Sequence, residues 1–155
     1  LEQSLSAEYE VQEELGRGGF AVVYKAHEKA TQRPMAIKQF VEPFRSAVDA
    51  MQTFREVMLQ RSCDSEHILP IEAVLSGPNQ DLVLVLPRME TDLHIALRAK
   101  LLKTPQQKQS VCAQMLLALE YLHARNTMHR DLKPPNLLLD VGTLHLRLCD
   151  FGLAR

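Results

Sequence analysis

The apolar and polar positions of the first ninety residues are mostly those typical of β-strands, interrupted by one helix. Val11 and Leu15 lie among polar neighbours, and the glycine-rich run 16–19 separates them from a β-rich segment at 21–26. This pattern predicts a hairpin with a glycine-rich turn. A third strand is predicted over 34–40, where the chain is again mainly apolar.

The period of the apolar residues changes after this strand. From about residue 46 to 61 they follow a helical spacing among charged residues, which predicts a helix. The residues that mark this imperfect stripe are Val48, Met51, Val57 and Met58. Two short apolar strands are predicted next, over 68–75 and 82–86, with a turn between them at 76–79.

A long helix is predicted to begin after Thr104. Threonine is a good N-cap, Pro105 fits the first turn, and Gln107 stands at the position that completes a capping box. The apolar face of this helix is predicted from spacings of four, four and three at Val111, Met115, Leu119 and Leu122. Two apolar runs around the turn 141–143 predict a second hairpin. The whole pattern predicts a small β-rich lobe with one helix, a hinge near 86–92 and the start of a helical lobe.

Composition and charge exclude several classes of protein. The 155 residues carry 18 Lys and Arg against 19 Asp and Glu, a net charge of −1, which argues against a broad surface for nucleic acid. No apolar run reaches the roughly 20 residues of a membrane-spanning helix, and the first residues lack the features of a signal peptide. Three cysteines without C-x-x-C spacing favour free thiols in a reducing compartment, the cytoplasm or the nucleus.

Three features of the first half are suited to a nucleotide, although each has a plainer interpretation. Gly16 and Gly18 would let backbone N–H groups approach phosphate, but two glycines in a hairpin are more often only a turn. Ala21 replaces the third glycine of G-x-G-x-x-G, and the run lies between strands, which disfavours a Rossmann dinucleotide site. Taken singly, Lys38 in its strand and Glu56 in its helix are interpreted as solvated surface charges.

The loop 129–136 carries a more specific set of groups. It brings the carboxylate of Asp131, the ammonium of Lys133 and the amide of Asn136 together between apolar segments. A polar surface loop is the plainer interpretation. The predicted hairpin would bring Asp150, in an Asp-Phe-Gly run, back towards Asn136, and a carboxylate with an amide oxygen suits magnesium.

These motifs, in this order, resemble those of the eukaryotic protein kinases. The matching residues, spread over 9–155, are Gly16 and Gly18 with Val23, Ala36-Ile37-Lys38, Glu56, His129-Arg130-Asp131 with Asn136, and Asp150-Phe151-Gly152. Lys133, two residues after Asp131, is similar to the serine/threonine branch. The runs 89–94, 119–123 and 149–155 resemble the mitogen-activated protein kinases.

The resemblance implies a fold and an activity. The fold is α+β, with a five-stranded antiparallel N-lobe and one helix over 1–88, then a hinge and the first part of a mainly helical C-lobe over 89–155. The activity is transfer of the γ-phosphate of ATP, with Mg²⁺, to Ser or Thr hydroxyls of protein substrates in a signalling cascade. The implied partners include an upstream activating kinase. Nucleic acid and a membrane are not expected as partners.

The resemblance also implies roles for single residues. Asp131 would accept the proton of the substrate hydroxyl, with Lys133 near the transferred phosphate. Lys38 would contact the α- and β-phosphates and form an ion pair with Glu56. The expected Mg²⁺ ligands are Asn136 and Asp150. The other expected ATP-binding residues are Leu15, Gly16, Gly18, Val23, Ala36, Leu86, Pro87, Met89, Asp92 and Leu138.

Two departures from the family pattern bear on activity. Gln60 stands where kinases place an apolar residue against Phe151, and a buried amide there needs hydrogen-bond partners. The chain also stops shortly after the Asp-Phe-Gly run, before an activation segment. Two hypotheses follow: the N-terminal part of an active Ser/Thr kinase, or a truncated, non-catalytic module that binds nucleotide or competes for a kinase's partners.

Overall fold

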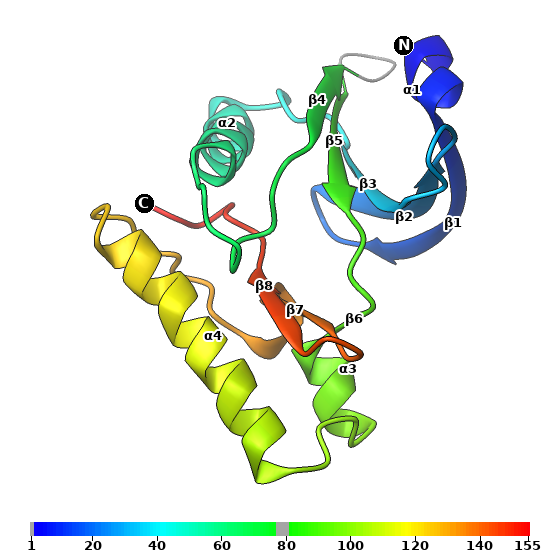
Figure 1. The fold of residues 1–155 in the computed structure, drawn as a ribbon. Coiled ribbons are helices and arrows are strands. Elements are labelled where there is room, and N and C mark those ends of the chain that lie inside the picture. The colour runs from blue at the N-terminus through cyan, green and yellow to red at the C-terminus, as the bar shows by residue number, and fades with distance from the viewer. Residues whose placement is uncertain (1, 77–80) are drawn as a thin grey trace. The chain divides into compact units, whose positions relative to one another are not determined.

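The computed structural model describes residues 2–76 and 81–155, which group into two compact units (Figure 1). The first unit comprises Leu1–Phe54 and Pro70–Arg88, and the second comprises Arg55–Leu69 and Met89–Arg155. The turn predicted at 76–79 lies, from position 77 onward, outside the described residues. Within the described part of the chain, no helix combines the length and the apolar character that crossing a membrane requires.

A five-stranded antiparallel sheet forms the first unit, in the order β1-β2-β3-β5-β4. The strands are β1 (Tyr9–Arg17), β2 (Ala21–Glu28), β3 (Pro34–Phe40), β4 (Ala73–Ser76) and β5 (Leu82–Pro87). This confirms the glycine-rich hairpin, the third strand and the expected sheet. The strand predicted over 68–75 begins only at Ala73, because Ile68 belongs to the second unit and forms a parallel bridge with Leu148 of the same unit.

One face of this sheet carries the core of the first unit. The residues that pack together there are Tyr9, Ala26, Met35, Ile37, Val83 and Val85. Leu5 of the short helix α1 (Glu2–Glu8) packs against this cluster. The apolar pattern does not predict α1, because a helix of only seven residues is too short to display a helical period.

The helix α2 (Ala47–Arg61) confirms the predicted helix, but its buried face differs from the predicted stripe. Among the stripe residues only Val57 is buried, whereas Val48, Met51 and Met58 are 74%, 60% and 50% exposed. The buried positions are Thr53, Glu56, Val57 and Gln60. Three of these four are polar, so the buried face of α2 is not the one that the apolar stripe predicts, and its polar groups need hydrogen-bond partners.

The second unit combines a three-stranded sheet, in the order β6-β7-β8, with helices that include the second half of α2. Its elements are β6 (Thr91–Asp92), α3 (Leu93–Arg98), α4 (Pro105–His123), the 3-10 helix η2 (Pro134–Asn136), β7 (Leu137–Asp140) and β8 (His145–Leu148). The pair β7–β8 is the predicted second hairpin. Its apolar core includes Ile68, Leu122, Leu139, Leu146, Leu148 and Phe151.

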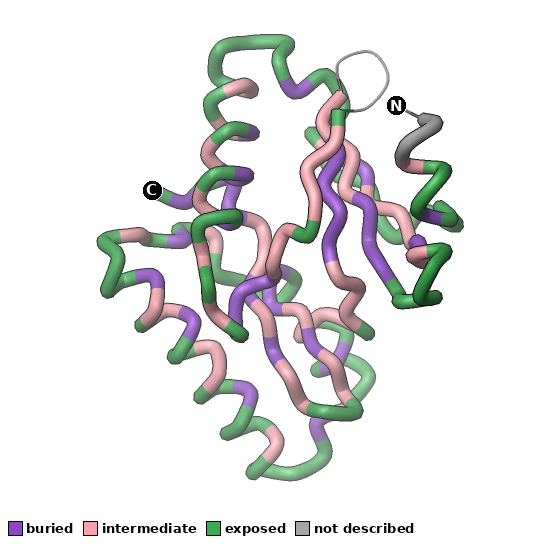
Figure 2. The backbone as a smooth tube through the Cα atoms, turned by 45° about the horizontal axis from the view of Figure 1, so that its top comes forward, coloured by how far each residue is buried: buried purple, intermediate pink, exposed green. Residues whose placement is uncertain are grey.

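The start of α4 follows the capping prediction. The hydroxyl of Thr104 accepts a hydrogen bond from the amide of Gln107 at 3.2 Å, and the Gln107 side chain accepts one from the amide of Thr104 at 3.0 Å. Figure 2 shows buried positions recurring along one side of this helix. These are Val111, Ala118 and Leu122, with Ala118 in place of the half-buried Leu119.

We expect Thr104→Ala to lower the free energy of unfolding by about 1 kcal/mol, because the amide of Gln107 loses its N-cap acceptor. For a domain of this size the melting temperature should fall by roughly 2–4 °C, measured by circular dichroism. Gln109→Ala, on an exposed turn of α4, is the matched control and should leave the melting temperature unchanged or slightly raised. Equal melting temperatures for the two variants would contradict the capping role.

Candidate active site

The loop before η2 gathers the polar groups of the second unit around Asp131. Lys133 Nζ lies 2.7 Å from Asp131 Oδ2. The amide of Asn136 donates to the same carboxylate oxygen and to the backbone carbonyl of Asp131, each at 2.9 Å. Pro134 and Pro135 form the single turn of η2 between Lys133 and Asn136. The chain direction is therefore set by two fixed φ angles, and the side chains of Lys133 and Asn136 converge on one oxygen of Asp131.

This convergence keeps Asp131 ionised. Partial burial raises the pKa of its carboxyl, but the hydrogen bonds from Lys133 and Asn136 outweigh burial and hold the pKa below its ordinary value of 3.8. The hydrogen bond to Asp131 in turn raises the pKa of Lys133 above its ordinary 10.5. At neutral pH the site therefore contains a carboxylate acceptor beside an ammonium group.

His129 ties this loop to the Asp-Phe-Gly segment. Its Nδ1 accepts a hydrogen bond from the amide of Asp131 at 3.3 Å, so its Nε2 carries the proton and donates to the carbonyl of Cys149 at 3.0 Å. The ring is 2% exposed and packs edge-on against Phe151, with centroids 5.0 Å apart. Burial lowers the pKa of His129 from 6.5, in spite of its hydrogen bond to Cys149.

We expect His129 to make the free energy of unfolding fall as the pH drops below about 6.5. The unfolded chain protonates this ring near 6.5, whereas the folded chain holds it neutral to a lower pH. The contribution is therefore complete above the unfolded pKa and is lost as the pH falls to the folded pKa. His129→Gln should flatten the melting temperature over this range, and the exposed His94→Gln should not. An unchanged slope in His129→Gln would count against the assignment.

Backbone pairing places Asp150 next to the loop. The amide of Cys149 donates to the carbonyl of Asn136 at 3.0 Å. Beyond Asp150, Met128 and Arg155 exchange two backbone hydrogen bonds of 2.7 and 2.9 Å. Arg130 Nε donates to the carbonyl of Leu153 at 2.8 Å. Hydrogen bonds therefore hold the Asp-Phe-Gly segment against the loop, in agreement with the predicted hairpin.

In the first unit, the strand register collects four of the expected ATP-binding residues on one face of the sheet. Val23 pairs with Lys38, and Ala36 pairs with Leu86. Residues directly opposite each other or two apart share a face, so these four project from the side opposite the core. Lys38 is half-buried, with its Nζ 5.0 Å from the centroid of the Phe40 ring.

The glycine-rich turn is open on this unit. Gly16 pairs with Val23, and a Cβ built at Gly16 would meet nothing within 4 Å. Neither Gly16 nor Gly18 has a positive φ. The turn itself therefore does not require glycine at these positions, which weakens the plainer interpretation and leaves the backbone accessible to a ligand.

The other expected ATP-binding residues differ in their surroundings. Leu15 is 48% exposed and Pro87, Met89 and Leu138 are half-buried. Asp92 caps α3, where its Oδ1 accepts a hydrogen bond from the amide of Ile95 at 2.9 Å. One carboxylate oxygen of Asp92 thus serves as the N-cap of α3, a role that the sequence analysis did not predict. An Asp one residue before an apolar helix was the available signal.

Glu56 and Gln60 lie on the buried face of α2. Glu56 is 4% exposed, which excludes the interpretation as a solvated surface charge, since a buried carboxylate requires a partner. Gln60 is 2% exposed, and its amide donates to the carbonyl of Leu69 at 2.8 Å. The hydrogen-bond partner expected for a buried amide at Gln60 is therefore a backbone carbonyl.

Comparison with known proteins gives one family model and several similar proteins that match nearly the whole chain. Residues 9–155 match the family model described as "Protein kinase domain". The chain is 41% identical to Extracellular signal-regulated kinase 2 of Dictyostelium discoideum, 37% to Mitogen-activated protein kinase 15 of Xenopus laevis and 38% to Mitogen-activated protein kinase 12 of Oryza sativa subsp. japonica. These alignments cover 100%, 100% and 97% of this chain, but only 42%, 27% and 26% of those relatives.

Proposed function

The chain belongs to the protein kinase domain family, and from this membership we propose that it binds ATP with Mg²⁺ and serves transfer of the γ-phosphate to protein Ser or Thr hydroxyls. One observation carries the proposal most directly. Lys133 and Asn136 converge on one carboxylate oxygen of Asp131, and the segment leading to Asp150 is hydrogen-bonded to Asn136. A sequence motif could exist without this geometry, whereas the geometry has a direct chemical use.

In this proposal Asp131 orients the substrate hydroxyl and accepts its proton. The lowered pKa keeps the carboxylate ionised at neutral pH, as an acceptor must be. Lys133, 2.7 Å away, would neutralise charge on the transferred phosphate. Phosphate transfer needs little covalent chemistry from the protein, so positioning and charge provide most of the rate.

Asn136 and Asp150 are the residues proposed to hold Mg²⁺. Asn136 uses its Nδ2 for Asp131, so its Oδ1 remains as the donor atom suited to a hard cation. The hydrogen bond from Cys149 to Asn136 keeps the Asp150 segment beside this amide. One amide and one carboxylate oxygen fit Mg²⁺, which takes few protein ligands and keeps several waters. When bound, the cation supplies charge neutralisation for the phosphates.

The proposed adenine and phosphate contacts begin on the sheet face of the first unit. Val23 and Ala36 would contact the adenine, and the open glycine turn would face the phosphates. Lys38 would contact the α- and β-phosphates. The backbone of Pro87 and Met89 would bond the adenine edge; Pro87 lacks an N–H but keeps its carbonyl. Asp92 keeps one carboxylate oxygen for the ribose.

The similarity to mitogen-activated protein kinases supports the finer proposal. The substrates would be proteins in a signalling cascade in the cytoplasm or nucleus, and an upstream kinase would activate the protein. Because the chain spans 42% or less of the three relatives compared, these statements concern the natural protein that carries these residues.

We expect Mg²⁺ and ATP to raise the melting temperature of the chain by roughly 5–10 °C. At a ligand concentration 100-fold above Kd, binding to the folded state adds about 2.7 kcal/mol, and each kcal/mol corresponds to about 2–4 °C at this size. Lys38→Met should abolish most of this shift. Lys29→Met removes an exposed lysine elsewhere in the first unit and should retain it. A full shift in Lys38→Met would refute the assignment of Lys38.

A module that binds nucleotide without transferring phosphate is the second candidate. The observation that favours it is the outer side of α4, where Leu116 and Leu117 are 60% and 49% exposed. Such apolar exposure on a long helix indicates a surface suited to another protein. A nucleotide-dependent melting shift without radiolabel transfer to a basic protein substrate would favour this candidate. Transfer that depends on Asp131 would exclude it.

A further inference from the structure

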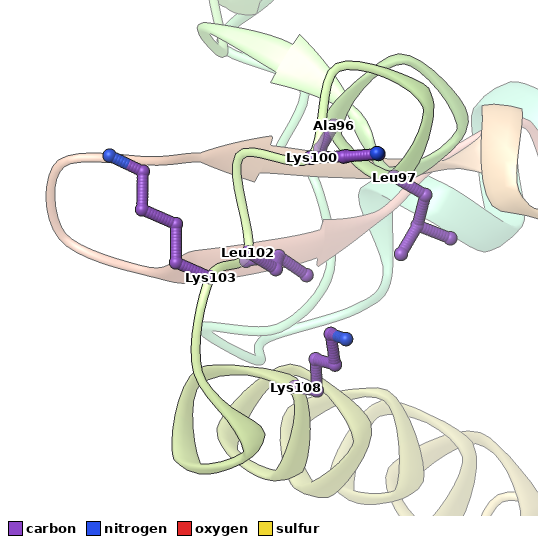
Figure 3. Close-up of a pocket in the computed structure, with 6 residues that line it drawn as sticks. All are labelled: Ala96, Leu97, Lys100, Leu102, Lys103 and Lys108. Atoms are coloured by element: carbon purple, nitrogen blue, oxygen red, sulfur yellow. The ribbon is translucent and has the colours of Figure 1, made fainter.

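The second unit contains a pocket that the proposed phosphate transfer does not use. It lies between the end of α3 and the start of α4 and has a volume of about 430 Å³ (Figure 3). The residues that line it are Ala96, Leu97, Lys100, Leu102, Lys103 and Lys108. Ala96 and Leu102 are buried in the core, so the floor of the pocket is apolar and firmly packed. Its volume is within the range of sites for small molecules.

Positively charged residues line the rim of the pocket. Half of the lining residues are lysines, and none is acidic. The sequence contains no Asp or Glu anywhere from 93 to 119, although the chain as a whole is balanced. Within the described residues, no carboxylate forms an ion pair with any of the three ammonium groups. The three positive charges therefore add up around one concave surface.

Lys100 occupies a backbone position that normally favours glycine. Its amide donates to the carbonyl of Leu97 at 3.1 Å, and the amide of Leu101 donates to Ala96 at 2.9 Å, which together form a Schellman motif at the end of α3. Lys100 is the residue after the C-cap, with φ of 54°. A side chain costs free energy in this left-handed conformation, and glycine does not. Lys100 therefore brings a positive charge to this end of α3 at a cost in backbone free energy.

We propose that this pocket binds a small molecule or headgroup that carries two or more phosphate groups. Phosphates would pair with Lys100, Lys103 and Lys108, which line the pocket at the end of α3, in the connection and at the start of α4 (Figure 3). Carbon atoms of the ligand would pack on Leu97 and Leu102. Lys103 extends away from Lys108 in Figure 3, so a bound phosphate would draw its flexible, exposed side chain inward.

The shared chemistry can come from a soluble polyphosphate or from a phosphoinositide headgroup. The concave shape favours a discrete ligand over a flat charged surface. All lining residues belong to the second unit, and none has a role in the proposed nucleotide site. The proposal therefore does not rest on the proposed kinase activity.

The binding test uses inositol trisphosphate, measured by isothermal titration at low and physiological salt. We expect saturable binding that weakens with salt, and a loss of about two- to fivefold in affinity for each of Lys100→Gln, Lys103→Gln and Lys108→Gln. The triple variant should lose at least about tenfold. Arg61→Gln, which removes one exposed positive charge outside the pocket, should bind as the wild type does.

A second variant separates binding from folding. Lys100→Gly should raise the melting temperature by about 2–4 °C, because it relieves the left-handed residue, while it weakens inositol trisphosphate binding. A purely structural role for Lys100 would move stability and leave the affinity unchanged. The triple glutamine variant should also keep the melting shift with Mg²⁺ and ATP, so failure at one site is distinguishable from failure at the other.

Vesicles of phosphatidylcholine with phosphatidylinositol bisphosphate, compared with phosphatidylserine vesicles of equal charge, identify the source. Binding to the bisphosphate vesicles alone, with loss in the triple variant, assigns a headgroup; binding of inositol trisphosphate without vesicle binding assigns a soluble ligand. Either result supports the proposal. Equal binding to both kinds of vesicle, tight binding of an acidic peptide in place of the phosphates, or inositol trisphosphate affinity unchanged in the triple variant would overturn it.

Discussion

Asp131→Asn is expected to lower the rate of phosphate transfer by about 10²–10⁴-fold in the natural protein that carries these residues. A positioned general base contributes a factor of this size. The asparagine amide fills the same volume, but it cannot accept the hydroxyl proton and offers a single acceptor oxygen. Lys133 and Asn136, which both contact the Asp131 carboxylate oxygen, would compete for that atom. The loss should therefore be in kcat with little change in KM for ATP.

The measurement is transfer of radiolabelled phosphate from ATP to a basic protein substrate. Asp64→Asn makes the same chemical change at an exposed loop position and should retain wild-type turnover. Thermal unfolding of both variants, each expected within a few degrees of the wild type, shows that the fold persists. Wild-type turnover in Asp131→Asn would remove the basis for the proposed mechanism.

Phe151→Ala is expected to produce the largest loss of stability, about 3–5 kcal/mol. Phe151 is fully buried in the core of the second unit, and its ring lies edge-on to His129. Removing the ring leaves a cavity beneath the hydrogen bonds that His129 makes to Cys149 and to the amide of Asp131. This loss is a large part of the about 5–15 kcal/mol by which such domains are stable. Because each kcal/mol corresponds to about 2–4 °C at this size, the melting temperature should fall by roughly 6–20 °C.

Two controls define this prediction. Phe54→Ala deletes a ring that is 64% exposed on α2 and should change the free energy of unfolding by less than about 1 kcal/mol. Phe151→Leu keeps much of the volume and should cost clearly less than the alanine variant. If the two phenylalanine-to-alanine variants melted alike, Phe151 would not be a core residue and the packing of the site would need revision.

The sequence by itself determined the features that depend on neighbouring residues. The glycine turn between β1 and β2, the capping box of Thr104 and the hairpin around 141–143 each follow from local spacing and local chemistry. The order of the motifs from Gly16 to Asp150 was also sufficient to indicate the family, because an ordered set of rare patterns requires no knowledge of contacts. The Asp131 cluster was predictable in the same way, since Lys133 and Asn136 lie on the same short loop.

The tertiary structure decided the features whose partners are backbone atoms far along the chain. Gln60 donates to Leu69, His129 to Cys149 and Arg130 to Leu153, and a carbonyl group is present at every residue, so it leaves no signature in the sequence. The same holds for α2, where burial selected a polar face over the apolar stripe. It also holds for the lysine pocket, since neither the left-handed φ of Lys100 nor the approach of Lys108 follows from local spacing. Local rules specify which elements form, and long-range packing specifies which faces and charges those elements bring together.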